Sequence, residues 1–265
     1  MIDVQNQSDH RELPIDMVGV KGVRCPVTVL DRARGRQNTV ATISVFVDLP
    51  QHFKGTHMSR FIELLNEHRG SIDIREFGRI LEQVKSRLEA RSASIELHFP
   101  YFITKKAPIS GLEAPMDYDV IYRGRIDEQD RQTLSLCVKV PIATVCPCSR
   151  EISDRGAHNQ RGVVTLSLRV KRFVWLEDLI QMVEKAGSGE LYALLKREDE
   201  KYCTESAYDH PRFTEDVVRE IGAQLRDDAN VVWFKVESET IESIHNHNAY
   251  ACIEMDKDLH PTPKA

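Results

Sequence analysis

The sequence contains no apolar run long enough for a membrane-spanning helix, no secretory signal at its start and no C-x-x-C pair of cysteines. Its longest apolar runs have the length of strands, so we expect no transmembrane segment and no membrane partner. Residues 1–16 are polar and acidic and lack the apolar core of an export signal. The sequence therefore predicts a cytoplasmic protein.

The missing C-x-x-C spacing removes support for a zinc ribbon or a thioredoxin-like redox site. The chain has six cysteines in 265 residues, and without an export signal they are expected to be free thiols in a reducing compartment. Cys25, Cys137 and Cys252 lie in apolar stretches that resemble strands. We expect these three to be buried and inert.

An excess of positive charge is also absent, since the formal net charge is −5. This balance argues against a nucleic-acid partner bound through overall charge, although it leaves room for a local basic pocket that holds a small polyanion. The G-x-x-x-x-G-K-[ST] pattern of a P-loop is missing as well. Hydrophobic residues make up 41% and charged residues 29%, which is ordinary for a globular protein.

The pattern of apolar residues predicts strands and helices in an order that occurs twice. Each half is expected to contain two strands, two helices and two strands, which indicates an α+β fold of antiparallel sheets with helices on one face. Expected strands cover residues 18–30, 40–49, 94–102, 116–125, 133–142, 163–170, 231–236 and 249–255, and expected helices cover 56–69, 73–91, 176–185 and 214–227.

These elements predict a leader (1–16), a first module (17–128), a second module (129–257) and a tail (258–265). The repeat is one of architecture, because the two halves show no convincing identity of residues. Open sheet edges in each module would be a liability unless they are covered or paired. Assembly of several copies is therefore a natural expectation.

The densest group of reactive side chains lies in residues 144–162, between two expected strands. Cys146 and His158 offer a thiolate and an imidazole, which suit a divalent transition metal. A catalytic site commonly uses three protein ligands, and a charged segment further on offers carboxylates for the third position. The spacing does not choose among Glu198, Glu200 and Glu205, and each is otherwise expected to be a solvated surface charge.

Cys148 lies two residues after Cys146, with Pro147 between them. Proline keeps the preceding residue out of the helical region, so we expect an extended segment in which both sulfur atoms face the same pocket. Cys148 would then be a second ligand or a reactive thiol activated by Arg150. The ordinary alternative is a structural cysteine.

Two further stretches carry ionisable groups. His245 and His247 lie between the last two expected strands and suit acid, base or water-positioning roles, unless they are simply exposed loop residues. Glu215 lies in the first turn of an expected helix, where a carboxylate commonly complements the helix dipole. Its alternative role is to accept paired N–H donors from a purine-like ring.

The start of the first expected helix is basic. Lys54, His57, Ser59 and Arg60 lie at this helix entry, where backbone N–H groups favour an anion, so the stretch is a candidate phosphate site. Thr56 is expected to cap the helix.

Five stretches stand out together: KGTHMSRF at 54–61, CPCSREIS at 146–153, GAHNQR at 156–161, HPRF at 210–213 and IHNHNAY at 244–250. Taken together, they resemble the family of GTP cyclohydrolase type IB, the prokaryotic enzyme that opens folate biosynthesis. The resemblance covers nearly the whole chain in order. It implies a bimodular tunnelling fold, with two β-β-α-α-β-β modules per subunit and a homotetramer whose active sites lie at subunit interfaces.

The resemblance also implies a reaction. Water adds at C8 of the guanine ring of GTP, the imidazole ring opens, formate leaves and the ribose rearranges to give 7,8-dihydroneopterin triphosphate. A divalent metal ion is implied as cofactor, with manganese, iron and zinc all within the range of the family.

The motif positions imply the roles of individual residues. Cys146, His158 and Glu200 match the metal ligands, and Cys148 matches an essential cysteine that is not a ligand. Glu215 matches the carboxylate that anchors guanine. His245 and His247 match histidines near the reacting centre, whereas Lys54, His57, Ser59 and Arg60 are inferred from charge and placement to contact the triphosphate.

Two alternatives remain open from the sequence. A nitrile reductase of the deazaguanine pathway shares the tunnelling fold, a reactive cysteine and an anchoring glutamate, but it uses NADPH and no catalytic metal. The metal-ligand set of Cys146, His158 and Glu200 argues against it. A protein that binds metal without catalysis would not turn over GTP, and Cys148 would be unimportant in it.

Overall fold

The structure, a computed structural model, describes residues 5, 7, 9–68 and 76–259. It divides into two compact units, one formed by residues 1–100 with 121–136 and the other by residues 101–120 with 137–265. Three long strands contribute a part to each unit: β3 (Ala93–Lys106), β4 (Glu113–Ile126) and β5 (Gln132–Val145). The predicted division of the chain near residue 128 stays a prediction.

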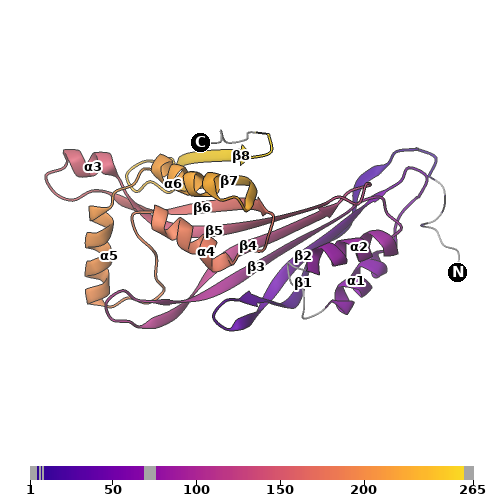
Figure 1. Cartoon of the computed structure of the whole chain (residues 1–265), viewed down its shortest axis with the longest axis horizontal. Helices are drawn as coiled ribbons and strands as arrows, with labels where there is room; N and C mark the ends of the chain where they lie inside the picture. Colours follow the sequence, from indigo (N-terminus) through magenta and orange to yellow (C-terminus); the bar gives the residue numbers. More distant parts are fainter. Residues whose placement is uncertain (1–4, 6, 8, 69–75, 260–265) are drawn as a thin grey trace. The chain divides into compact units, whose positions relative to one another are not determined.

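The first unit is a sheet with two helices (Figure 1). Its first strands, β1 (Ile15–Asp31) and β2 (Gly35–Leu49), form an antiparallel hairpin, and β2 pairs antiparallel with β3. α1 (Met58–Glu67) and α2 (Phe77–Arg87) follow β2. The two helices bury the apolar side chains that recur every three or four residues, namely Phe61, Leu64, Leu65, Phe77, Ile80, Leu81 and Val84.

The second unit adds the elements that follow β5. α3 (Pro147–Ile152) leads to β6 (Asn159–Val170), and β7 (Val231–Thr240) and β8 (Ala249–Asp256) complete the sheet. β6 pairs antiparallel with β7, and β7 with β8. Between β6 and β7 lie three helices: α4 (Leu176–Ala186), α5 (Arg197–Asp209) and α6 (Thr214–Asp227).

Figure 1 shows α4 and α6 lying against the strands of the second unit, and α6 contacts α4, β7 and β8. α6 buries Val217, Val218, Ile221 and Leu225, as the spacing of its apolar residues predicts. Val164, Leu166 and Leu168 of β6 are buried on one face, which confirms the predicted alternation. The strands follow one another across the sheet in chain order, from β1 to β8. The predicted α+β fold is confirmed.

Several local predictions are wrong. The cap of α1 is His57, not Thr56, and no side chain caps this helix end. Residues 146–148 do not form an extended segment, because α3 begins at Pro147 and Cys146 is its cap. Proline restricts the residue before it, but it is itself well suited to the first position of a helix, where its missing N–H is not needed.

All six cysteines are free, as predicted. Cys25 and Cys137 are buried, which confirms the expectation for these two. Cys252 is exposed, so that prediction is wrong. It lies on β8, the last strand of the sheet, where exposed and half-buried side chains alternate and Cys252 is on the exposed side.

The second predicted helix, 73–91, is observed as α2 up to Arg87, and its predicted start at residue 73 lies outside the described residues. Residues 260–265 of the predicted tail 258–265 also lie outside them. The charged segment after residue 196 is a helix, α5, which no apolar periodicity indicates. Among the described residues, no helix is both long and apolar enough to cross a membrane.

Candidate active site

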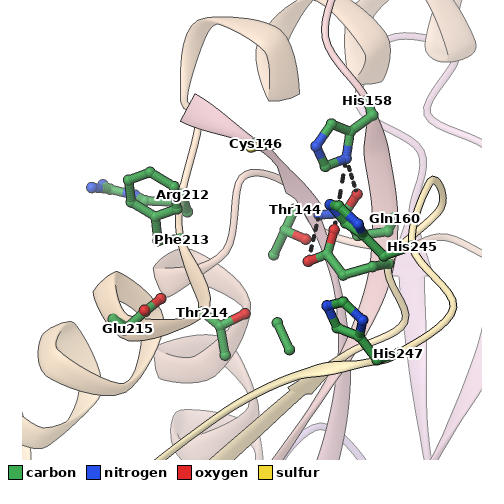
Figure 2. A pocket seen from close by; sticks show the side chains of 12 residues that line it. Thr144, Cys146, His158, Gln160, Arg212, Phe213, Thr214, Glu215, His245 and His247 are labelled. Atoms are coloured by element: carbon green, nitrogen blue, oxygen red, sulfur yellow. Dashed lines mark hydrogen bonds and ion pairs between the residues drawn. The ribbon is translucent and has the colours of Figure 1, made fainter. Parts of the chain in front are cut away.

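A pocket of about 270 Å³ in the second unit gathers most of the reactive side chains singled out in the sequence. It is formed by the end of β5, the start of β6, the first turn of α6 and the segment between β7 and β8. Its lining residues are Thr144, Cys146, His158, Gln160, Arg212, Phe213, Thr214, Glu215, Glu242, His245, His247 and Ala249. Figure 2 shows His158, Gln160 and His245 gathered on one side of it, and Arg212, Phe213 and Glu215 on the other.

Cys146 and His158 are fixed to one another through the backbone. The Cys146 amide donates to the His158 carbonyl at 3.1 Å, and the His158 amide donates to Ser149 Oγ at 3.1 Å. Ser149 also donates from its amide to Cys146 Sγ at 3.5 Å, and from its hydroxyl to the Cys146 carbonyl at 3.3 Å. These contacts hold the Cys146 sulfur in place beside His158.

The His158 ring is oriented by two polar neighbours. Its Nδ1 lies 2.9 Å from Gln160 Oε1 and 3.7 Å from Glu242 Oε2, and Gln160 Nε2 donates to Glu242 Oε1 at 3.3 Å. Because the Gln160 amide nitrogen is directed at Glu242, its oxygen accepts from His158 Nδ1–H. This arrangement leaves Nε2 with the free lone pair that a metal ion requires.

The two loop histidines continue from His158 along the pocket wall. The rings of His158 and His245 are 6.4 Å apart between centroids and nearly perpendicular, and those of His245 and His247 are stacked at 5.1 Å. Both loop histidines are exposed, so their rings are open to water as well as to the pocket. Three imidazoles therefore lie in succession along one wall of the pocket.

Glu215 is exposed and lines the pocket from the first turn of α6. The capping function at this helix start is supplied by its neighbour, because Asp216 Oδ2 accepts the Phe213 amide at 2.9 Å. Within the described part of the chain, the Glu215 carboxylate has no hydrogen bond or ion pair. It is therefore available to a ligand.

Several residues predicted for the site are not brought to the pocket. Glu200 is exposed on α5, and Cys148 is exposed on α3; neither lines the pocket. Lys54, Ser59 and Arg60 are exposed and His57 is half-buried around the start of α1, in the first unit. The roles predicted for these residues stay predictions.

The donor chemistry of the pocket fits a transition metal, since a thiolate and a neutral imidazole are typical ligands of such ions. Cys146 and His158 supply two donors. In the ranges that the structure describes, no group of three or more His, Cys, Asp or Glu side chains is placed to hold a metal ion. A third ligand is therefore needed beyond the pair that this pocket supplies.

The pocket also contains residues to which sequence analysis gave no role. Gln160 and Arg212 lie inside the stretches that carry the family resemblance, and Glu242 lies just before one of them. This proximity to the motifs is the feature of the sequence that could have indicated a role for them. Thr144 Oγ1 and Arg212 Nε are buried with no hydrogen-bond partner among the described residues. Buried polar atoms are normally paired, so both atoms are suited to meet a bound ligand or water.

Comparison with known proteins gives consistent relatives. A family model described as "Type I GTP cyclohydrolase folE2" matches residues 1–251. GTP cyclohydrolase FolE2 of Syntrophobacter fumaroxidans is 55% identical, with 97% of this chain and 100% of the relative covered. The FolE2 of Syntrophus aciditrophicus is also 55% identical over the same shares, and that of Nitrosococcus oceani is 52% identical over 96% and 95%.

Solved structures with a similar backbone are urate oxidases. Urate oxidase of Bacillus subtilis 168 has a TM-score of 0.52 at 6% identity and covers 91% of this chain and 99% of its own. A hyperthermostable mutant of the Bacillus sp. TB-90 urate oxidase has a TM-score of 0.51 at 10% identity, over 92% and 99%. At this identity the likeness concerns the fold alone, and it identifies the tunnelling fold.

Proposed function

The chain belongs to the type I GTP cyclohydrolase family named FolE2 and is a GTP cyclohydrolase, and from this premise we propose that the pocket around Cys146 is its active site. The observation that supports the proposal most strongly is that five side chains singled out in the sequence line one pocket, Cys146, His158, Glu215, His245 and His247. The product is 7,8-dihydroneopterin triphosphate, and formate is released. The finer family name, type IB, belongs to this proposal.

Glu215 binds the guanine base. Its carboxylate is unpaired among the described residues and faces the pocket, while Asp216 caps the helix beside it. Guanine presents two parallel N–H donors on one edge, which a carboxylate accepts in a bidentate manner. Adenine lacks this pair of donors. An adenine in the pocket would leave the carboxylate without partners, so the site discriminates against it.

Cys146 and His158 hold the divalent metal ion, and Glu200 is the proposed third ligand. Manganese, iron and zinc are the candidate metals. Such an ion supplies Lewis acidity and lowers the pKa of water, which gives the reaction a nucleophile near pH 7. Gln160 holds His158 in the tautomer that presents Nε2, and the Ser149 amide holds the Cys146 sulfur in place.

His245 and His247 move protons at the ring that opens. Their stacked rings lie on the wall next to His158 and reach solvent, so a proton taken at the guanine ring has an exit. Cys148 is the proposed reactive thiol. Cys148 is exposed on α3, so its thiol is accessible to a substrate or to a neighbouring copy of the chain.

The triphosphate is proposed to contact Lys54, His57, Ser59 and Arg60. In the proposed homotetramer the active sites lie at subunit interfaces. The protein is proposed to work in the cytoplasm at the first step of tetrahydrofolate biosynthesis.

A direct assay tests the activity. Purified protein is loaded with Mn²⁺ and given GTP, and formate is measured together with the fluorescence of the oxidised product. We expect both signals with GTP, neither with ATP and neither with Cys146→Ala. A folded, metallated sample that yields no formate and no fluorescent product contradicts the proposal.

The same sample separates the alternatives. A nitrile reductase would oxidise NADPH in the presence of a nitrile substrate, which absorbance at the nicotinamide band follows, and a non-catalytic metal-binding protein would leave GTP intact. The relatives are GTP cyclohydrolases over nearly their full length, so neither alternative is favoured.

A further inference from the structure

Lys105 lies near the end of β3 and is almost fully buried, with a side chain that is 9% exposed. Its ammonium contacts two carboxylates, Glu184 Oε1 at 2.7 Å and Glu190 Oε2 at 2.8 Å. Tyr118 of β4 donates its hydroxyl to the same Glu184 oxygen at 2.7 Å, and the Tyr192 ring lies 4.6 Å from the ammonium. One buried cation therefore joins two acidic residues that are six positions apart in the chain.

Between these two carboxylates, the residues that follow the end of α4 form a strap, which we define as residues 187–189. The strap lies on the end of β5. The Ser188 amide donates to the Ala143 carbonyl at 2.9 Å, and the Ala143 amide donates to the Gly189 carbonyl at 3.0 Å. The Val145 amide donates to Ser188 Oγ at 2.9 Å. β5 ends at Val145 and the next residue in the chain is Cys146, so the strap holds the backbone immediately before the proposed ligand.

The close approach of the strap depends on glycine. A Cβ atom at Gly187 would lie 3.1 Å from Ile142 Cβ and 3.2 Å from the Ala143 carbonyl oxygen. Ser188 is 5% exposed, and Lys105 binds a carboxylate on either side of the strap, Glu184 before it and Glu190 after it. Burial raises the pKa of Glu184, while Lys105 and Tyr118 oppose that change. Lys105 and Tyr118 thus hold this carboxylate in place.

The turn between β3 and β4 makes a second set of contacts, with the start of α5. Asp199 is fully buried and accepts the amides of Ile109 and Ser110 at 2.8 Å each, and the Ser110 hydroxyl at 2.6 Å. It also accepts the Lys196 amide at 2.9 Å. The residue after Asp199 is Glu200, the proposed third ligand. The same hairpin therefore contacts both segments that carry proposed metal ligands.

We propose that the end of the β3–β4 hairpin positions the metal ligands, with Lys105 acting on Cys146 through the strap and Ser110 acting on Glu200 through Asp199. This inference rests on the proposed function. Neither residue lines the pocket, so both are positioning residues. A support of this kind sets the affinity and geometry of metal binding, because ligands that are not held in place must be ordered when the ion binds.

The test uses Co²⁺ as the probe, because a thiolate ligand gives cobalt a charge-transfer absorption that reports on Cys146 without any enzyme turnover. The full-length protein is titrated with Co²⁺ as wild type, Lys105→Met and Ser110→Ala. Lys106→Met is the matched control, since this neighbouring lysine is exposed on the same strand. Thermal unfolding is measured on the same samples.

We expect Lys105→Met and Ser110→Ala to weaken Co²⁺ binding by roughly ten- to a hundredfold, the usual range for residues that support metal ligands. Lys105→Met should also shift or weaken the thiolate band. A general loss of stability would not change this band in a sample that remains folded. Lys105→Arg should restore part of the affinity because it keeps the cation. Lys106→Met should match wild type.

The outcomes distinguish a failure of the positioning role of the hairpin from a failure of the proposed metal site. If wild type shows a thiolate band that Cys146→Ala removes, and folded Lys105→Met and Ser110→Ala bind Co²⁺ as wild type does, the hairpin does not position the ligands and the inference is wrong. If wild type shows no thiolate band, the proposed metal site itself is wrong. If Lys105→Met does not fold, Ser110→Ala and Lys105→Arg decide the question through the same band and affinity.

Discussion

At the scale of single residues, the start of α6 divides two tasks between neighbouring carboxylates. Asp216 accepts the Phe213 amide and caps the helix, while Glu215 lines the pocket without a partner among the described residues. A carboxylate in the first turn of a helix ordinarily complements the helix dipole or caps the helix. Because Asp216 does the capping here, the Glu215 carboxylate is left available to the base.

Substitution of the two carboxylates should separate these tasks. Glu215→Gln removes a charged acceptor and should lower kcat/KM for GTP on the order of ten- to a hundredfold with little loss of stability. Asp216→Ala should leave kcat/KM close to wild type but cost about 0.5–2 kcal/mol of stability through the helix cap. Initial rates and thermal unfolding measure both. An equal fall in kcat/KM for the two variants would mean that Glu215 has no special contact with the base.

The two neighbouring cysteines provide a second prediction. Cys146→Ala should lose the metal ion, because it removes a thiolate that lines the pocket beside His158. Cys148→Ala should keep the metal, since this exposed residue does not line the pocket. It should lose GTP turnover, since Cys148 is the proposed reactive thiol. Metal content by elemental analysis and formate release are the two measurements. Metal loss of equal size in both variants would remove the division of roles.

The residues of the site that sequence could predict are those whose chemistry is rare and local. Cys146, His158 and Glu215 were found from residue type, spacing and resemblance. Gln160 and Glu242 were not assigned roles, because their contact joins positions 82 apart in the chain and depends on how β6 meets the segment after β7. A polar side chain that orients a ligand carries no signature in a single sequence.

At the scale of elements, α6 and α5 show what a sequence pattern can predict. α6 was predicted with its observed bounds, because its apolar residues recur with helical spacing against β7 and β8. α5 was missed as an element. Only Asp199 is buried along it, and the helix is held by the hydrogen bonds that this carboxylate accepts from the β3–β4 turn. Such support comes from tertiary contacts and has no periodicity.

Asp48 ties the end of β2 to the start of β3 and provides a prediction about pH. It accepts the Ser92 amide at 2.6 Å and Arg91 Nε at 2.9 Å, and Arg91 also lies 3.4 Å from Glu128. Burial alone would raise the pKa of Asp48, but these hydrogen bonds lower it below its usual value. A carboxyl whose folded pKa is lowered stabilises the fold fully above its unfolded pKa of about 3.9, and this stabilisation is lost as pH falls through the folded value.

Asp48→Asn should therefore lower the free energy of unfolding by about 1–3 kcal/mol at pH 7, because it removes a charged acceptor. The gap from wild type should begin to narrow as pH falls below about 4, because the unfolded chain then binds a proton at this carboxyl while the folded carboxyl stays ionised to lower pH. Urea unfolding at pH 7 and at pH 3.5 measures the gap. A gap of the same size at both values would show that the ionised carboxylate is not its source.

At the scale of the whole molecule, two groups of predicted site residues lie in different compact units. Cys146 and Glu215 line one pocket in the second unit, whereas Lys54 and Arg60 lie at the start of α1 in the first. The fold class was predictable, because apolar residues recur with a period of two in the strands and about 3.6 in the helices. The assembly was not, because the surfaces that meet in an oligomer need no pattern within one chain.

Mixing of inactive subunits tests whether the triphosphate contacts come from a neighbouring copy. Cys146→Ala is co-expressed with the double variant Lys54→Ala/Arg60→Ala, and separately with Glu215→Gln, each on differently tagged chains purified in sequence. If each site takes its metal ligand from one copy and its phosphate contacts from another, random pairing restores roughly a quarter of the sites in the first mixture. The second mixture should restore none, because Cys146 and Glu215 line the same pocket of one chain. Absence of recovery in the first mixture would place both groups in one subunit, and recovery in the second would show that the pocket is shared between copies.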